Sequence, residues 1–360
     1  MLGLLVLGLT AIMIYTLVKN ALLGKQISKD DSFTGTVELL VPVSENSVFL
    51  LEEWQKLINA SHLIPGQLKI HLLLDGIHPK LTAWQELLKS TPYIEAHSFP
   101  MKPQSAPPVT WMLDQISSKI QSQIVVIGDP ELVPTEHVFL SISKAILEKN
   151  RSYFIVPQTA KSTLLGETIA VLNPTLAFTS FFGSKKWRRN FTNPLLKISQ
   201  GWMAMKLETF RELDFKASKN LSWKEHISRQ WDEQKKNYHL AFGEKHLIRY
   251  YPTDLKTHVE QLRNQWEELA QSKDKVGFAL YILVLFLWSF PVVCLMTHPF
   301  WAIASFFLLI LYRFFSKIVF QESWTSIILH LLGCIFWLGT LVWYVVDLTS
   351  GNLKVKRIKE

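Results

Sequence analysis

The chain has 360 residues, of which 48% are hydrophobic and 19% charged, with two cysteines and a formal net charge of +8. This apolar content excludes an intrinsically disordered protein, and two cysteines in so long a chain exclude a small disulfide-stabilised domain. Residues 276–347 hold few charged side chains, whereas residues 25–275 have the composition of a globular protein. The sequence therefore predicts a membrane protein with one soluble domain of ordinary size.

Much of the positive charge lies beside the apolar segments, for example at Lys19, at Lys25 and in the C-terminal tail. Basic residues in such positions usually face the cytoplasm and anionic lipid headgroups, so the charge predicts contact with membrane lipids rather than nucleic acid. Both cysteines, Cys294 and Cys334, lie in apolar runs. No disulfide framework is expected, which is consistent with a soluble domain on the reducing side of the membrane.

Residues 2–18 form an uncharged apolar run that is long enough to cross a bilayer with little tilt. Because positive charge follows this run, we expect an uncleaved anchor with an external N-terminus and a soluble domain that faces the cytoplasm. The predicted parts are an anchor at residues 1–23, a soluble domain at 34–272, membrane segments at 276–347 and a basic tail at 348–360.

From residue 36 onward, short β-rich runs alternate with longer segments of helical period. This alternation predicts an α/β fold with a mostly parallel sheet. The predicted strands are residues 37–41, 68–74, 94–99, 124–127 and 153–156. The predicted helices are residues 47–59, 81–88, 109–121 and 136–148.

Acidic residues follow three of these strands: Glu45 the first, Asp75 the second, and Asp129 and Glu131 the fourth. Ligands of open α/β sheets bind outside the carboxyl ends of the strands. Carboxylates there can hold a divalent cation and accept hydrogen bonds from a base or ribose, so the pattern predicts a nucleotide site. The alternative is that each of these acids caps a helix or forms a turn.

In chain order, these segments resemble the inverting family-2 glycosyltransferases with a GT-A fold, over residues 37–266. Residues 42–46 (Pro-Val-Ser-Glu-Asn) are similar to a Pro-x-x-Asn-Glu-like turn of that family, with the last two residues exchanged. Residues 129–134 (Asp-Pro-Glu-Leu-Val-Pro) are similar to its Asp-x-Asp motif. The nucleotide-sugar contacts that the resemblance implies are Pro42, Ser44, Glu45, Asp75 and Asp129.

The resemblance also implies a divalent cation, Mg²⁺ or Mn²⁺, held by Asp129 and Glu131 against the diphosphate of a UDP-sugar. Glu131 stands where the family has a second Asp, which keeps the charge on a longer side chain. Residues 201–206 loosely resemble a Gly- and Ala-containing segment of the family, and residues 238–242 its "GYRVAF" segment.

Counting back from residues 238–242 places the catalytic base of the family at Glu225, with His226 as the substitute. An inverting transferase needs such a group to deprotonate the acceptor hydroxyl. The alternatives are that Glu225 is a solvated helix charge and that His226 is structural or merely exposed. Residues 262–266 approximate the family's Gln-x-x-Arg-Trp, with Gln265 and Trp266 on the diphosphate and acceptor side but no matching Arg.

The C-terminal part holds three apolar runs, at residues 276–297, 300–320 and 324–346. Three crossings would put the basic tail outside, so either the positive-inside tendency is overridden or one run lies in the interface. The middle run, interrupted by Arg313 and Lys317, is the best candidate for the interface.

An anchor, a GT-A domain and a membrane bundle form the layout of family members that glycosylate lipids, such as ceramide glucosyltransferases and bacterial transferases acting on carotenoids or hopanoids. Residues 176–190 place aromatic side chains beside four cations, which suits docking at lipid headgroups. The leading hypothesis is a metal-assisted transfer of sugar from a UDP-sugar to a lipid hydroxyl, with inversion. The alternatives are a family member that binds but does not catalyse, and an unrelated membrane protein with a Rossmann-like domain.

Overall fold

A computed structural model describes most of the chain. The described residues are 2–23, 25–26, 35–43, 67–75, 93–99, 108–134, 138–159, 201–217, 223–234, 238–242, 247–249, 256, 259, 263, 275–295, 297–320 and 324–349. The chain divides into two compact units. One comprises Met1–Val18, Ala160–Phe181 and Tyr251–Glu360, and the other Lys19–Thr159 and Phe182–Tyr250.

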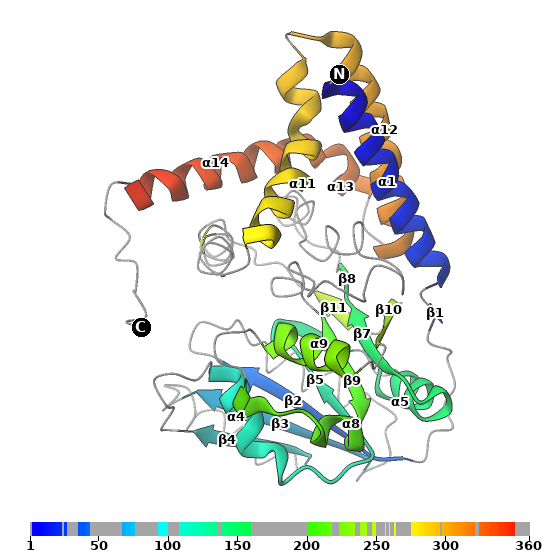
Figure 1. Cartoon of the computed structure of the whole chain (residues 1–360), viewed down its shortest axis with the longest axis vertical. Coiled ribbons are helices and arrows are strands. Elements are labelled where there is room, and N and C mark those ends of the chain that lie inside the picture. Colours follow the sequence, from blue (N-terminus) through cyan, green and yellow to red (C-terminus); the bar gives the residue numbers. More distant parts are fainter. Residues whose placement is uncertain are drawn as a thin grey trace. The chain divides into compact units, whose positions relative to one another are not determined.

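The first unit holds the apolar helices (Figure 1). These are α1 (Leu2–Leu23), α11 (Lys275–Cys294), α12 (Pro299–Phe320), α13 (Trp324–Ile328) and α14 (His330–Thr349). Among the described residues, the stretches Leu2–Lys19, Pro299–Val319 and His330–Asp347 are long and apolar enough to cross a membrane. The predicted run 324–346 is interrupted, since α13 ends at Ile328 and α14 begins at His330. The number and direction of the crossings stay predictions.

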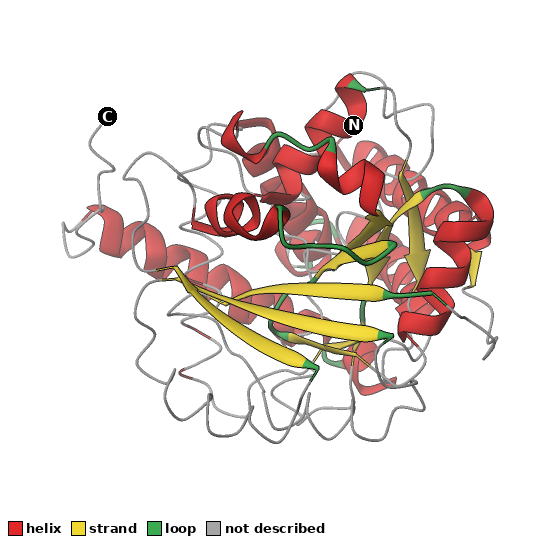
Figure 2. Cartoon of the chain, turned by 90° about the horizontal axis from the view of Figure 1, so that it is seen from below, coloured by secondary structure: helices red, strands yellow, loops and turns green. Residues whose placement is uncertain are grey.

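The second unit contains a large sheet whose strands lie side by side with a twist (Figure 2). The strand order is β1-β10-β7-β9-β5-β2-β3-β4, and β9 alone among these described strands runs antiparallel to its neighbours. The strands are β1 (Lys25–Gln26), β2 (Val37–Val43), β3 (Leu68–Asp75), β4 (Ile94–Phe99), β5 (Ile124–Ile127), β7 (Ser152–Val156), β9 (Trp202–Lys206) and β10 (Tyr238–Phe242). This mostly parallel sheet confirms the predicted α/β fold.

A smaller sheet has the order β6-β11-β8, formed by β6 (Leu132–Pro134), β11 (Leu247–Arg249) and β8 (Gln158–Thr159). The helical segments of this unit are α4 (Pro108–Ser117), α5 (Val138–Lys149), α8 (Leu207–Arg211), η1 (Phe215–Ala217) and α9 (Trp223–Glu233). Helices α4 and α5 confirm two predicted helices, although α4 ends at Ser117 and not at residue 121. The predicted helices at 47–59 and 81–88 lie outside the described residues.

The alternation of side chains along β2, β3 and β4 gives the sheet two different faces. One face, which includes Leu39, Ile70 and Ile94, packs with α5 in the main hydrophobic core. The other face carries Phe99, whose ring meets Trp111 of α4 edge to face at a centroid distance of 5.6 Å. Helices therefore cover the sheet from both sides, and the ends of the strands are left as the place for a site.

Candidate functional site

The site is built where β5 ends and β9 begins. Gly128 directly follows β5, and its N–H donates to the carbonyl oxygen of Leu40 in β2 at 2.9 Å. Because β9 is antiparallel to β5, with Met203 opposite Ile127, the first residues of β9 lie beside the last residues of β5. This arrangement brings Gly201 next to Asp129, although the two are 72 residues apart in the sequence.

The carboxylate of Asp129 is held by two donors. Its Oδ2 accepts the N–H of Gly201 at 2.8 Å and lies 2.7 Å from the Nζ of Lys224. The side chains of Lys224 and Asp129 are 6% and 14% exposed, so this is a nearly buried ion pair. Lys224 lies in the first turn of α9, so one carboxylate connects β5, β9 and α9.

Gly201 has no room for a side chain. A Cβ atom there would lie 2.5 Å from the Cζ of Phe154 and 2.7 Å from the carbonyl oxygen of Ile155. We expect Gly201→Ala to lower the free energy of unfolding by about 1–3 kcal/mol, because a backbone oxygen cannot move aside as a flexible side chain does.

Chemical denaturation of the full-length protein in detergent tests this expectation. The matched control is Gly339→Ala in α14, where nothing lies within 4 Å of the added Cβ. If Gly201→Ala lowered the free energy of unfolding no more than Gly339→Ala does, the close approach of β9 to β7 would be contradicted.

Side chains of helix α9 form hydrogen bonds to the backbone of Asp214. The Nε2 of His226 lies 2.7 Å from the carbonyl oxygen of Asp214, and the side chain of Gln230 bonds both the N–H and the carbonyl of the same residue at 2.9 Å. A carbonyl oxygen only accepts, so a proton on Nε2 of His226 would complete this hydrogen bond. Burial is the main cause that lowers the pKa of His226. His226 is thus a buried side chain that connects α9 to Asp214, and its role as the substitute base stays a prediction.

Glu225 follows Lys224 in the first turn of α9 and is 5% exposed. The alternative that it is a solvated helix charge is therefore wrong. A carboxylate in this position interacts favourably with the partial positive charge of the helix N-terminus. Glu225 directly follows Lys224, the residue that pairs with Asp129, and it stays the candidate base.

Three further predicted site residues lie in or next to the strands. Pro42 is buried in β2 opposite Leu73, and Asp75 is the last residue of the neighbouring strand β3. Glu131 lies half-buried in the turn between β5 and β6. Four predicted site residues lie outside the described residues, namely Ser44, Glu45, Gln265 and Trp266.

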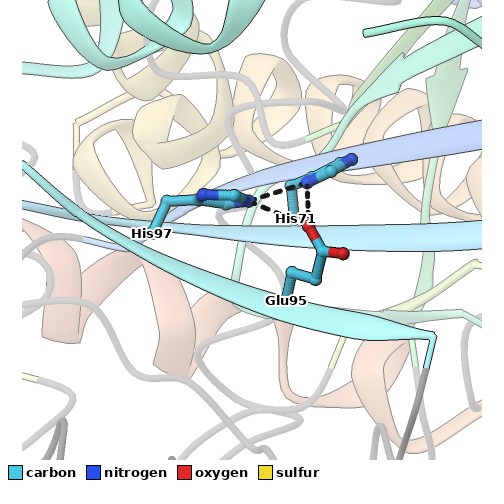
Figure 3. A group of neighbouring side chains, drawn as sticks. All are labelled: His71, Glu95 and His97. Carbon is cyan, nitrogen blue, oxygen red and sulfur yellow. Dashed lines mark hydrogen bonds and ion pairs between the residues drawn. The ribbon is translucent and has the colours of Figure 1, made fainter. Parts of the chain in front are cut away.

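The described residues do not offer a ready metal site at Asp129. The ammonium of Lys224 occupies the Oδ2 atom, and a divalent cation bound there would compete with that positive charge. Asp129 and Glu131 as metal ligands therefore stay a prediction. A group of ligand atoms lying within 4.8 Å of one another is found elsewhere in the described part of the chain, at His71, Glu95 and His97 (Figure 3).

No family model matches the sequence, and no curated protein matches it. Among solved structures, the mannosyltransferase PcManGT from Pyrobaculum calidifontis, in complex with GDP-Man and Mn²⁺, is 13% identical with a TM-score of 0.49; the match covers 99% of this chain and 100% of that one. TarS 1-349 from S. aureus, in complex with UDP-GlcNAc, is 8% identical with a TM-score of 0.41, covering 84% of this chain and 92% of that one. These similarities are too weak to assign a family.

Proposed function

We propose that the chain is a membrane-bound glycosyltransferase that transfers a sugar from a UDP-sugar to the hydroxyl group of a lipid, with inversion. The observation that carries this proposal is the joining of Asp129, Gly201 and Lys224 at the strand ends, with the buried Glu225 as the next residue of α9 after Lys224. A cation at this edge can bind a nucleoside diphosphate, and a carboxylate that reaches the same edge can accept a proton.

The proposed roles follow from the charges of the side chains. Glu225 accepts the proton of the acceptor hydroxyl, so the oxygen can attack the sugar carbon as the diphosphate leaves. Lys224 is a fixed cation at the same edge, where it can offset negative charge on the diphosphate. A Mg²⁺ or Mn²⁺ ion, for which Asp129 and Glu131 would supply the hard oxygen ligands, would add further positive charge there.

The apolar helices support a lipid as the acceptor. Helix α12 exposes large apolar side chains at Phe300, Ile303, Phe307 and Ile310, which are spaced along one helical face. Such a stripe on an apolar helix suits contact with lipid. An enzyme held in a bilayer by these helices would meet an amphiphilic acceptor in the same membrane.

The function is tested by the release of UDP from a panel of UDP-sugars, with purified protein in mixed-lipid nanodiscs containing Mg²⁺ or Mn²⁺. We expect lipid-dependent release that Asp129→Asn abolishes. Asp114→Asn, at a partly exposed position of α4, is the matched control and should leave release unchanged. Equal release from the Asp129→Asn protein would contradict the proposed site.

The same measurement decides the second candidate, a nucleotide-sugar-binding protein without catalysis. The observation that favours it is the close Lys224–Asp129 ion pair, because a metal ion would have to compete with the ammonium of Lys224 for the carboxylate of Asp129. Saturable binding of a UDP-sugar with no release, over the whole lipid panel, would establish this second function instead.

A further inference from the structure

Three side chains that can bind metal ions converge on strands β3 and β4 (Figure 3). The Nδ1 of His71 lies 2.9 Å from the Nε2 of His97. The Oε2 of Glu95 lies 3.8 Å from the Nδ1 of His71 and 3.5 Å from the Nε2 of His97. Three potential ligand atoms, one from each residue, therefore point toward a common centre.

The register of the sheet creates this group. His71 is directly opposite Glu95 in the parallel β3–β4 pair, and His97 follows Glu95 by two residues on the same face. The adjacent residues Ile70 and Leu72 in β3 and Ile94 in β4 point to the opposite face, into the main hydrophobic core. The group thus lies on the face of the sheet that carries Phe99, away from the end of β5 where Asp129 is found.

The distances suit a tetrahedral ion. With metal–nitrogen and metal–oxygen bonds of about 2.0–2.2 Å, two ligand atoms of a tetrahedral zinc ion lie about 3.3–3.5 Å apart. The observed separations of 2.9, 3.5 and 3.8 Å fall on both sides of this value. A shift of a few tenths of an ångström in each side chain would bring all three atoms to bonding distance.

The surroundings also suit a metal ligand. Glu95 uses Oε1 to pair with the Nζ of Lys69 at 2.9 Å, which leaves the Oε2 atom facing the two histidines. The Nε2 of His71 is buried without a hydrogen-bond partner in the described structure, and it lies 4.0 Å from the Oε2 of Glu38. A metal bound at Nδ1 would keep the proton on Nε2, where it faces that carboxylate. Metal-binding histidines commonly have such a carboxylate behind them.

We propose that His71, Glu95 and His97 form a binding site for a divalent transition-metal ion, with Zn²⁺ as the best match. Two imidazoles and one carboxylate are ligands that Zn²⁺ favours, whereas Mg²⁺ prefers an octahedral shell of oxygens. The side chains of Glu95 and His97 are 44% and 18% exposed, so an ion can enter from solvent and keep a fourth position for water. The ion would tie the edge strand β4 to β3.

The test uses the full-length protein in detergent after removal of metals with a chelator. Isothermal titration with Zn²⁺ is expected to show one equivalent bound, and Co²⁺ in its place should give the visible absorption of a tetrahedral ion. His97→Gln and Glu95→Gln are each expected to weaken Zn²⁺ binding at least about tenfold. His298→Gln, a substitution at an exposed histidine outside the group, should leave the affinity unchanged.

Asp129→Asn separates this site from the proposed transferase site and should bind Zn²⁺ as the wild type does. The proposal is overturned if the wild type binds no Zn²⁺, or if binding survives both His97→Gln and Glu95→Gln. It is also overturned if an Asp129→Asn protein that circular dichroism shows to be folded has lost the binding. Because Glu95 is 44% exposed, Glu95→Gln should fold as the wild type does, and circular dichroism checks this. If His97→Gln does not fold, the Glu95→Gln protein decides.

Discussion

Replacing Lys224 by methionine is expected to destabilise the protein by about 3–5 kcal/mol, because it leaves the carboxylate of Asp129 buried without its cation. The Nζ of Lys224 lies 2.7 Å from Oδ2 of Asp129, and the two side chains are 6% and 14% exposed. Methionine keeps most of the length and apolar surface of the lysine stem. The loss therefore reports on the charge, with the N–H of Gly201 remaining as a donor to Asp129.

The measurement is the free energy of unfolding by chemical denaturation of the full-length protein in detergent. The matched control is Lys144→Met, which removes an i,i+4 pair with Glu148 at 3.9 Å on the surface of α5. That control is expected to cost about 0.5 kcal/mol or less. The double variant Lys224→Met/Asp129→Asn should recover part of the stability, because no charge is then left buried alone. A loss at Lys224 no larger than at Lys144 would show that the pair is not formed.

Glu225→Gln is expected to lower kcat about 10²–10⁴-fold and to leave the KM for the UDP-sugar nearly unchanged. Glutamine has the shape of glutamate but cannot accept the proton of the acceptor hydroxyl at neutral pH. Because Glu225 is 5% exposed and sits in the first turn of α9, an isosteric amide disturbs the packing little. A loss confined to kcat would therefore identify a proton acceptor rather than a structural group.

Single-turnover transfer in lipid nanodiscs, with UDP-sugar binding measured in parallel, tests this second expectation. Glu233→Gln is the matched control, since Glu233 lies at the other end of α9 with a side chain that is 60% exposed. His226→Gln should mainly lower stability, because His226 holds the carbonyl of Asp214. Full turnover by the Glu225→Gln protein would show that Glu225 is not the base. The proposed transferase activity itself would still be tested by the Asp129→Asn experiment.

The strands of the parallel sheet could be predicted because their pattern is local. The runs at 94–99 and 124–127 have the bounds of β4 and β5, and the other three predicted strands differ by two residues or fewer at an end. A run of consecutive apolar residues between turn residues predicts a buried strand without knowledge of its partners. Residues 201–206 are predicted as a motif and not as a strand, because the antiparallel place of β9 between β5 and β7 depends on pairing with distant segments.

The candidate site was predicted in part. The sequence positions of Asp129 and Glu225 predict both as site residues, but nothing in the sequence indicates that Lys224 pairs with Asp129 across 95 residues. The role of Gly201 as a donor depends in the same way on the antiparallel start of β9. Partners of this kind are set by the order of strands in the sheet, which local patterns do not specify.

The apolar helices, the α/β class and the acidic residues after the strands can be predicted from local sequence, because hydrophobic period and strand-end position are properties of neighbouring residues. Which charged side chains meet depends on the folded chain. It paired Asp129 with Lys224, turned His226 toward Asp214, and placed His71 opposite Glu95 and near His97. The physical reason is that electrostatic and metal-ligand contacts act over a few ångströms in space, and sheet register, not sequence spacing, sets that distance.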